Sequence, residues 1–220
     1  MVYVTGDVHG DISDLSSRNI GRLKKDDVLI ITGDFGFIWD NSKSEIKNLK
    51  KLAKKKFTIL FIEGVHENFE LLSQYEECEI YNSKARKIAD NIFCLNRGEI
   101  YEIENRSYFC LGGGDFDDIF EKGDSDALTN KCMPTDEELK YAVDNLQNAG
   151  KRVDYIITHE APASVKRLIR RDSTTNDLNI FFDTILHNVR YHKWFFGSLH
   201  TDRELSTHMV CVWQDVIKVN

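Results

Sequence analysis

The chain has 220 residues and 41% hydrophobic side chains, enough to bury one sizeable core, so we predict a single domain over residues 1–220. Its formal net charge is -7 at pH 7. This acidic balance argues against a general nucleic-acid coat, because such proteins normally carry a basic excess.

The cysteines are odd in number, are scattered along the chain and form no C-x-x-C pair: Cys78, Cys94, Cys110, Cys132 and Cys211. This spacing predicts reduced, mostly buried thiols of a cytosolic protein rather than a disulfide framework or a zinc site. No apolar run approaches the roughly 18 residues that span a bilayer, and Asp7 and His9 stand where a leader peptide would be apolar. We therefore expect a cytoplasmic protein without a membrane segment.

The first third of the chain alternates short apolar runs with amphipathic segments. The pattern predicts strands over 1–5, 28–32 and 57–62, helices over 11–25 and 42–56, and a further helix that starts at Phe69. Asp11 or Ser13 can cap the first helix. A row of lysines between Lys43 and Lys56 could bind phosphate backbones, but a solvated helix face is the favoured interpretation.

The middle of the chain changes character. Short runs at 92–95, 99–103 and 107–111 predict an antiparallel meander that ends in three glycines and Asp115. Residues 115–131 are acidic and predict a surface loop, in which we expect Asp117 and Asp118 to be solvated. The remaining segments predict helices over 134–149 and 178–189, strands over 153–158 and 191–196, and a closing hairpin formed by 209–213 and 216–219.

Five predicted strands run directly into side chains that can bind a metal ion or move a proton: Asp7 with His9, Asp34, His66, His159 and His200. Asp7 and His9 are two residues apart, so in an extended chain they point to the same side. Asp oxygen and neutral His nitrogen are ordinary metal ligands. Each position alone is more often a turn or a buried ring. Their repetition favours one shared site, because sites in α/β folds lie outside the carboxyl ends of strands.

The order and spacing of these motifs resemble the calcineurin-like metallophosphoesterases. The matching motifs are G-D-V-H-G at 6–10, G-D-F-G at 33–36, G-V-H-E at 64–67, T-H-E at 158–160 and G-S-L-H at 197–200. The second motif lacks the arginine-containing extension of the protein Ser/Thr phosphatases, so the chain looks more like the bacterial and phage-type members. The resemblance implies an α/β fold in four layers, an αββα sandwich of two mixed sheets flanked by helices.

The resemblance also implies hydrolysis of a phosphate ester by water activated between two metal ions. By position, Asp7, His9 and His200 would hold the first ion, Asp34 would bridge both, and His159 would hold the second. Catalysis would rest on Asp34 and on His66, which would serve the leaving group as proton donor or charge stabiliser. Mixed Asp and His ligation suits Mn, Fe or Zn better than Ca or Mg.

Two positions depart from the family pattern, because Val65 stands for an asparagine and Ser198 for a histidine. Both lost side chains would have served the second metal, so we expect one firmly bound ion and an uncertain second. Replacement by Glu67, Asn68 or Glu160 is the less favoured interpretation.

Two functions therefore stay open. The first is a working phosphoesterase for a nucleotide, nucleic-acid or phosphoprotein substrate, which the retained His66 favours. The second is a catalytically degenerate member that acts as a binding or scaffold module, which the paired losses favour. Nucleic-acid binding through the lysine face has only its charge to support it. We expect segments 115–131 and 163–190 to shape the pocket, and the sequence does not indicate an oligomeric state.

Overall fold

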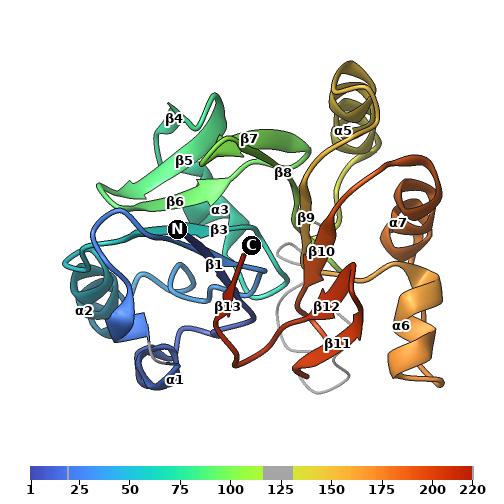
Figure 1. Cartoon of the computed structure of the whole chain (residues 1–220). Coiled ribbons are helices and arrows are strands. Elements are labelled where there is room, and N and C mark those ends of the chain that lie inside the picture. The colour runs from blue at the N-terminus through green and yellow to red at the C-terminus, as the bar shows by residue number, and fades with distance from the viewer. Residues whose placement is uncertain (19, 116–130, 220) are drawn as a thin grey trace.

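Two β-sheets packed face to face form the centre of the computed structural model, which describes residues 1–18, 20–115 and 131–219. Helices cover the outer face of each sheet (Figure 1). The predicted four-layer αββα sandwich is confirmed.

The first sheet has seven strands in the order β13-β1-β2-β3-β6-β5-β4. Strands β1, β2, β3 and β6 are parallel, whereas the edge pairs are antiparallel. Parallel strands are covered on both faces, which explains their continuous apolar runs. The strands are β1 Val2–Thr5, β2 Val28–Ile31, β3 Thr58–Phe61, β4 Glu77–Ile80, β5 Ser83–Ala89, β6 Ile92–Leu95 and β13 Ile217–Lys218.

The second sheet has six strands in the order β11-β12-β10-β9-β8-β7. Its inner strands β12, β10, β9 and β8 are parallel, and each outer strand is antiparallel to its neighbour. The strands are β7 Glu99–Ile103, β8 Arg106–Leu111, β9 Tyr155–Thr158, β10 Lys193–Phe196, β11 Arg203–Ser206 and β12 Met209–Cys211.

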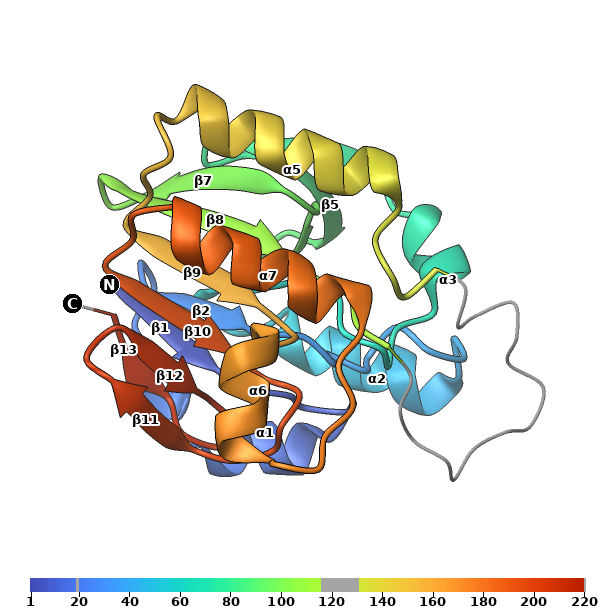
Figure 2. The ribbon, with the colours of Figure 1, turned by 90° about the vertical axis from the view of Figure 1, so that its right-hand side faces the viewer.

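Among the described residues, three helices pack on each sheet (Figure 2). The first sheet carries α1 Ile12–Ser17, α2 Lys43–Leu52 and α3 Phe69–Ser73, and the second carries α5 Asp136–Asn148, α6 Ala163–Ile169 and α7 Asp177–Asn188. Side-chain caps fix where several of them begin, as with Asp11 at α1 and the Thr135 capping box at α5. No helix among the described ranges is long and apolar enough to cross a bilayer.

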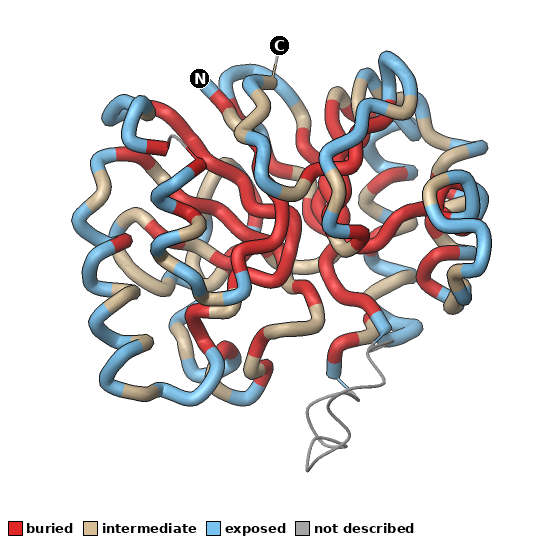
Figure 3. The backbone as a smooth tube through the Cα atoms, turned by 90° about the horizontal axis from the view of Figure 1, so that it is seen from below, coloured by how far each residue is buried: buried red, intermediate tan, exposed pale blue. Residues whose placement is uncertain are grey.

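The core between the sheets consists of apolar side chains from both sheets, including Val4, Ile30, Ile157 and Phe195. Buried residues concentrate along the central strands and exposed ones along the outer helices (Figure 3). All five cysteines are free, and all except Cys78 are buried, as predicted.

Several expectations for individual elements were wrong. The meander does not exist as one unit, because β6 pairs in parallel with β3 whereas β7 and β8 form a hairpin in the other sheet. The closing hairpin is also wrong, since β12 pairs with β10 and β11 and β13 pairs with β1.

The expected helix over 11–25 ends after Ser17 and is followed by a short 3-10 helix, Ile20–Arg22, whereas the helix expected over 42–56 ends at Leu52. Strands β4, β5 and β11 and helix α6 were not predicted. The predicted acidic loop, with Asp117 and Asp118, lies outside the described residues except at its ends.

Arg97, between β6 and β7, links the layers through its guanidinium, which is almost fully buried. It pairs with Glu63 at 2.6 Å and with Glu138 at 3.0 Å, and it donates to the carbonyl of Cys132 at 3.1 Å. Glu63 follows β3 of the first sheet and Glu138 lies in α5 on the second. One side chain therefore ties the first sheet to a helix of the second.

Replacing Arg97 with Met should lower the free energy of unfolding by about 3–5 kcal/mol, because Glu63 would lose its cation in a mostly buried position. Urea denaturation followed by circular dichroism measures this loss. The matched control is Arg106→Met, since Arg106 pairs with Asp154 at 3.4 Å on the surface and its removal should cost no more than about 1 kcal/mol. Equal losses in the two variants would contradict the linking role of Arg97.

Candidate metal centre

The loops after β1, β2 and β10 bring two carboxylates and two imidazoles together. Their ligand atoms all lie within 4.8 Å of one another, and the residues are Asp7, His9, Asp34 and His200. Nε2 of His200 lies 3.0 Å from Nε2 of His9 and 3.1 Å from Oδ2 of Asp7. Nε2 of His9 lies 3.8 Å from Oδ2 of Asp34. Two imidazole nitrogens therefore face two carboxylates, an arrangement typical of metal ligands.

The chemistry of this group fits a divalent cation. Asp7 is 1% exposed and Asp34 is 2% exposed, whereas the His9 and His200 rings reach solvent. Oδ1 of Asp7 is buried and accepts no hydrogen bond from any residue that the structure describes. Nδ1 of His159 faces this oxygen only at 3.6 Å. A buried carboxylate oxygen without a hydrogen bond is costly, so a cation placed among these residues would satisfy it.

The charges within the group favour ionised carboxylates. Burial by itself raises the pKa of Asp7 and of Asp34, but His159 beside them, together with the other histidines, holds each pKa below its ordinary value. Burial lowers the pKa of His159, but the attraction of Asp34 and Asp7 is stronger and raises that pKa to about 10. The attraction between this ring and the two carboxylates, at 3.6 Å from Oδ1 of Asp7 and 3.7 Å from Oδ1 of Asp34, is the shared cause of these shifts.

The backbone at this group adopts a conformation that side chains usually avoid. The φ angles are 49° at His9, 46° at Asp34, 53° at Ser198 and 47° at His200. All four lie in the left-handed region, which non-glycine residues enter uncommonly and which recurs at functional sites. The loops thus hold these side chains in orientations that a regular strand end would not give.

Two glycines make room for the carboxylates. A Cβ atom at Gly64 would lie 2.0 Å from Oδ1 of Asp34, and one at Gly197 would lie 2.3 Å from Oδ1 of Asp7. Any side chain at either position would collide with a carboxylate. This explains why the strand-end motifs at 64–67 and 197–200 begin with glycine.

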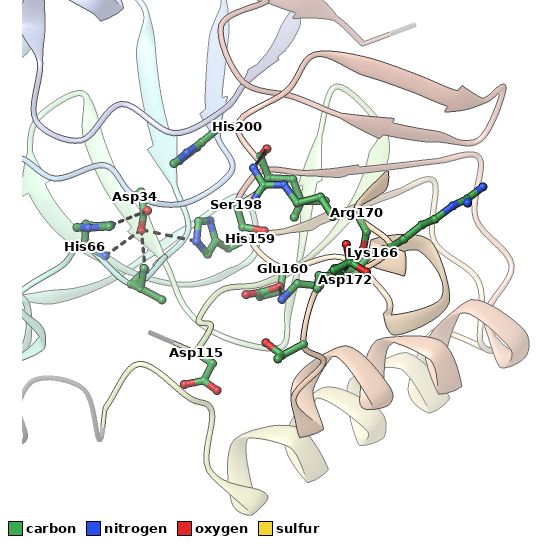
Figure 4. A pocket seen from close by; sticks show the side chains of 15 residues that line it. Asp34, His66, Asp115, His159, Glu160, Lys166, Arg170, Asp172, Ser198 and His200 are labelled. Atoms are coloured by element: carbon green, nitrogen blue, oxygen red, sulfur yellow. Dashed lines mark hydrogen bonds and ion pairs between the residues drawn. The ribbon is translucent and has the colours of Figure 1, made fainter. Parts of the chain in front are cut away.

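His66 is held against Asp34. Oδ1 of Asp34 accepts the backbone N–H groups of Val65 at 2.6 Å and His66 at 2.8 Å, and its Oδ2 lies 2.8 Å from Nδ1 of His66. Figure 4 shows Asp34 between His66 and His159. The carboxylate therefore fixes the position of the His66 ring beside the group.

The half of the site around His159 offers fewer ligand atoms. Nδ1 of His159 lies 3.1 Å from the carbonyl oxygen of Thr32, and Nε2 lies 3.7 Å from Oδ1 of Asp34. Val65 offers no ligand atom from its side chain. Ser198 donates its backbone N–H to Oδ2 of Asp7 at 3.1 Å, and its buried hydroxyl has no hydrogen bond to a described residue.

The three residues considered as replacement ligands are engaged elsewhere. Glu67 accepts two backbone N–H groups, Asn68 caps α3, and Glu160 pairs with Lys166 at 3.2 Å. Glu67 and Asn68 are thus held through all their side-chain polar groups, and Glu160 is held through Oε2.

Arg18 is a positioning residue that the sequence did not reveal. Its guanidinium donates to the carbonyl of Gly6 at 3.0 Å, to the carbonyl of Asp7 and to that of Trp213 at 2.6 Å, and it pairs with Asp14. Arg18 therefore fixes the peptide groups before and after Asp7. No motif signals such a residue, because its contact with Trp213 joins distant parts of the chain.

A layered sandwich with Asp and His side chains gathered at its strand ends defines the chain as a candidate metal-dependent enzyme. The family model for calcineurin-like phosphoesterases matches residues 1–208. The chain belongs to this family, as its motifs predict.

Two solved structures resemble the chain. One, described as a 5′-nucleotidase from Staphylococcus aureus, has 13% identity and a TM-score of 0.49, with 97% of this chain and 48% of that chain covered. The other, a phosphopantetheinyl hydrolase from Mycobacterium tuberculosis, has 11% identity and a TM-score of 0.45, with 96% and 89% covered. This chain therefore spans about half the length of the first. No curated protein matches the sequence.

Replacing Asp7 with Asn should weaken binding of Mn²⁺ at least about 100-fold, because loss of an outer-shell partner alone typically costs 10- to 100-fold. Isothermal titration of the metal-free protein measures the affinity and the stoichiometry. Asp11→Asn is the matched control, since Asp11 only caps α1 and asparagine caps a helix equally well. Unchanged metal content in the Asp7 variant would refute the ligand assignment.

Proposed function

We propose that the chain is a metal-dependent phosphoesterase that hydrolyses a phosphomonoester or phosphodiester with a metal-activated water. The convergence of Asp7, His9, Asp34 and His200 on one point carries this proposal, together with the family membership. These four residues would hold the first divalent ion, for which Mn, Fe or Zn suits the mixed ligands. Asp34 and His159 would be the remaining ligands of a weakened second site.

A bound divalent cation lowers the pKa of a water and polarises phosphoryl oxygens. The side chains of Asp34 and His66 would assist the leaving group. Asp34 orients His66 through the 2.8 Å contact with Nδ1. Burial lowers the pKa of His66, but Asp34 outweighs burial and raises that pKa above the ordinary value. A protonated His66 can then give its proton to the departing alcohol oxygen.

The degenerate alternative rests on Val65 and Ser198. Without ligand atoms there, a second ion has only Asp34 and His159, and losing it would remove several kcal/mol of transition-state stabilisation. The protein would then keep the fold and the first metal and act as a binding module. The partner we propose in either case is a phosphate ester, whether nucleotide, nucleic acid or phosphoprotein. A cytoplasmic location is supported by the five free cysteines.

Replacing His66 with Asn should lower kcat about 10²- to 10⁴-fold for an alkyl phosphate, because the leaving alkoxide needs a proton. The loss should be smaller for 4-nitrophenyl phosphate, whose leaving group needs no proton. Steady-state kinetics with Mn²⁺ on both substrates measures this, and exposed His187 in α7 gives the control His187→Asn. Equal losses on the two substrates would remove the proton-donor role.

The double variant Val65→Asn/Ser198→His should bind a second metal ion and hydrolyse generic phosphate esters about tenfold faster or more, because a second cation stabilises the phosphoryl transition state. Metal analysis and Mn-dependent turnover of a phosphodiester and a phosphomonoester measure both effects.

The same experiment separates the two functions. Two ions in the unaltered chain, with turnover that the double variant does not improve, would refute the weakened second site. One ion and no turnover in the unaltered chain, with a second ion and turnover gained in the double variant, would establish the degenerate alternative.

A further inference from the structure

The cavity beside the metal centre is larger than a single phosphate needs. Its volume is about 710 Å³, in the range of sites for nucleotide-sized ligands. One part of its wall is formed by Asp34, His66 and His200, and another by the end of α6 and the segment after it, including Arg170 and Arg171. Figure 4 shows Ser198 and His159 between the Asp34–His66 pair and the residues of α6.

Arg170 is exposed at the mouth of this cavity and, unlike three buried cations of this protein, has no ion pair with a described residue. Arg18, Arg97 and Lys166 each pair with a carboxylate of Asp14, Glu63 or Glu160. For the side chain of Arg170 the structure describes one hydrogen bond, from Nη2 to the carbonyl of Leu199 at 2.9 Å. A guanidinium has five N–H donors in a planar fork.

This hydrogen bond places the Arg170 side chain beside the loop 197–200 of the candidate centre. Leu199 lies between Ser198 and the metal-ligand candidate His200, so the guanidinium is fastened to the loop that supplies a ligand. Its other N–H groups have no hydrogen-bond partner among the described residues, and because the side chain is exposed they are open to a ligand in the cavity. Planar bidentate binding of phosphate or carboxylate is the recognition for which arginine is best suited.

The nearby acidic groups do not cancel this charge. Lys166 and Glu160 neutralise each other inside the wall at 3.2 Å. Asp115 and Asp172 also line the cavity, but both are exposed, and neither forms an ion pair with a described cation.

We infer that the α6 side of this cavity is a second anion subsite, in which Arg170 binds a phosphate or carboxylate of the substrate other than the phosphate that reacts. This inference rests on the proposed function, because a substrate subsite requires that the chain hydrolyse a phosphate ester. The expected substrates are phosphate esters whose alcohol part carries a further anionic group.

The kinetic test compares two probes, adenosine 3′,5′-bisphosphate and adenosine 5′-monophosphate, with the metal-loaded protein. We expect a higher kcat/KM for the bisphosphate. In Arg170→Ala the ratio of the two kcat/KM values should fall at least about tenfold, the loss expected for one charge-assisted pair. Arg170→Lys should give an intermediate ratio, because lysine keeps the charge and loses the fork.

Arg167→Ala is the matched control. Arg167 lies in the same helix and is exposed, and it bonds to Thr175 outside this cavity. The same fall of the ratio in Arg167→Ala would overturn the inference, because it would show a general effect of charge. Equal losses on both probes in Arg170→Ala would also overturn it, since Arg170 would then act on the reacting phosphate.

A binding measurement separates this inference from the proposed function. Inorganic phosphate is titrated into the metal-free protein and followed by ³¹P NMR. We expect binding that weakens at least about fivefold in Arg170→Ala and is unchanged in Arg167→Ala. Such binding without turnover of any ester would support the subsite while refuting the enzyme. Turnover with phosphate binding that does not depend on Arg170 would refute the subsite alone.

Discussion

Two buried carboxylates that face the same point are the constraint on which this structure depends. Asp7 and Asp34 come from neighbouring strands of one sheet, and both are almost fully excluded from solvent. Two such charges are tolerated only where positive charge and N–H donors surround them. The structure provides His159 between them, the backbone N–H groups of Val65 and His66 on Asp34, and that of Ser198 on Asp7.

The same constraint explains the unusual backbone of the loops. Non-glycine residues with left-handed φ angles are strained, and glycines lose much conformational entropy on folding, so both lower the stability of the folded chain. They nevertheless recur at each loop that contacts a carboxylate. Their cost is offset by the sheets that they follow, whose strands are held by apolar cores on both faces. The rigid layers thus support loops that would not adopt these conformations alone.

The sequence allowed the central strands and the candidate ligands to be predicted, because both depend on local patterns. A parallel buried strand is a continuous apolar run, and a ligand follows its end at a short fixed offset. The elements that were missed lack such a pattern. Strands β4 and β5 alternate charged and small side chains at the edge of the first sheet, where one face meets solvent, and their pairing depends on distant neighbours.

The sequence did not predict which strands pair or what the long side chains contact, because both depend on distant parts of the chain. Strands β6 and β7 are close in sequence but enter different sheets, and β13 returns to β1 from the far end of the chain. Arg18 and Arg170 each contact a backbone carbonyl that only the folded chain brings near. Residue type and spacing carry no information about such contacts.

The position of the candidate centre at the seam of the two sheets has a mechanical consequence. Asp7, His9 and Asp34 belong to loops of one sheet and His200 to a loop of the other. The separation of these candidate ligands is therefore set by how the apolar side chains between the sheets interlock. Close-packed interiors resist deformation and transmit strain. A change in the volume of a core side chain such as Tyr155 or Ile30, neither of which belongs to the centre, shifts one half of the centre against the other.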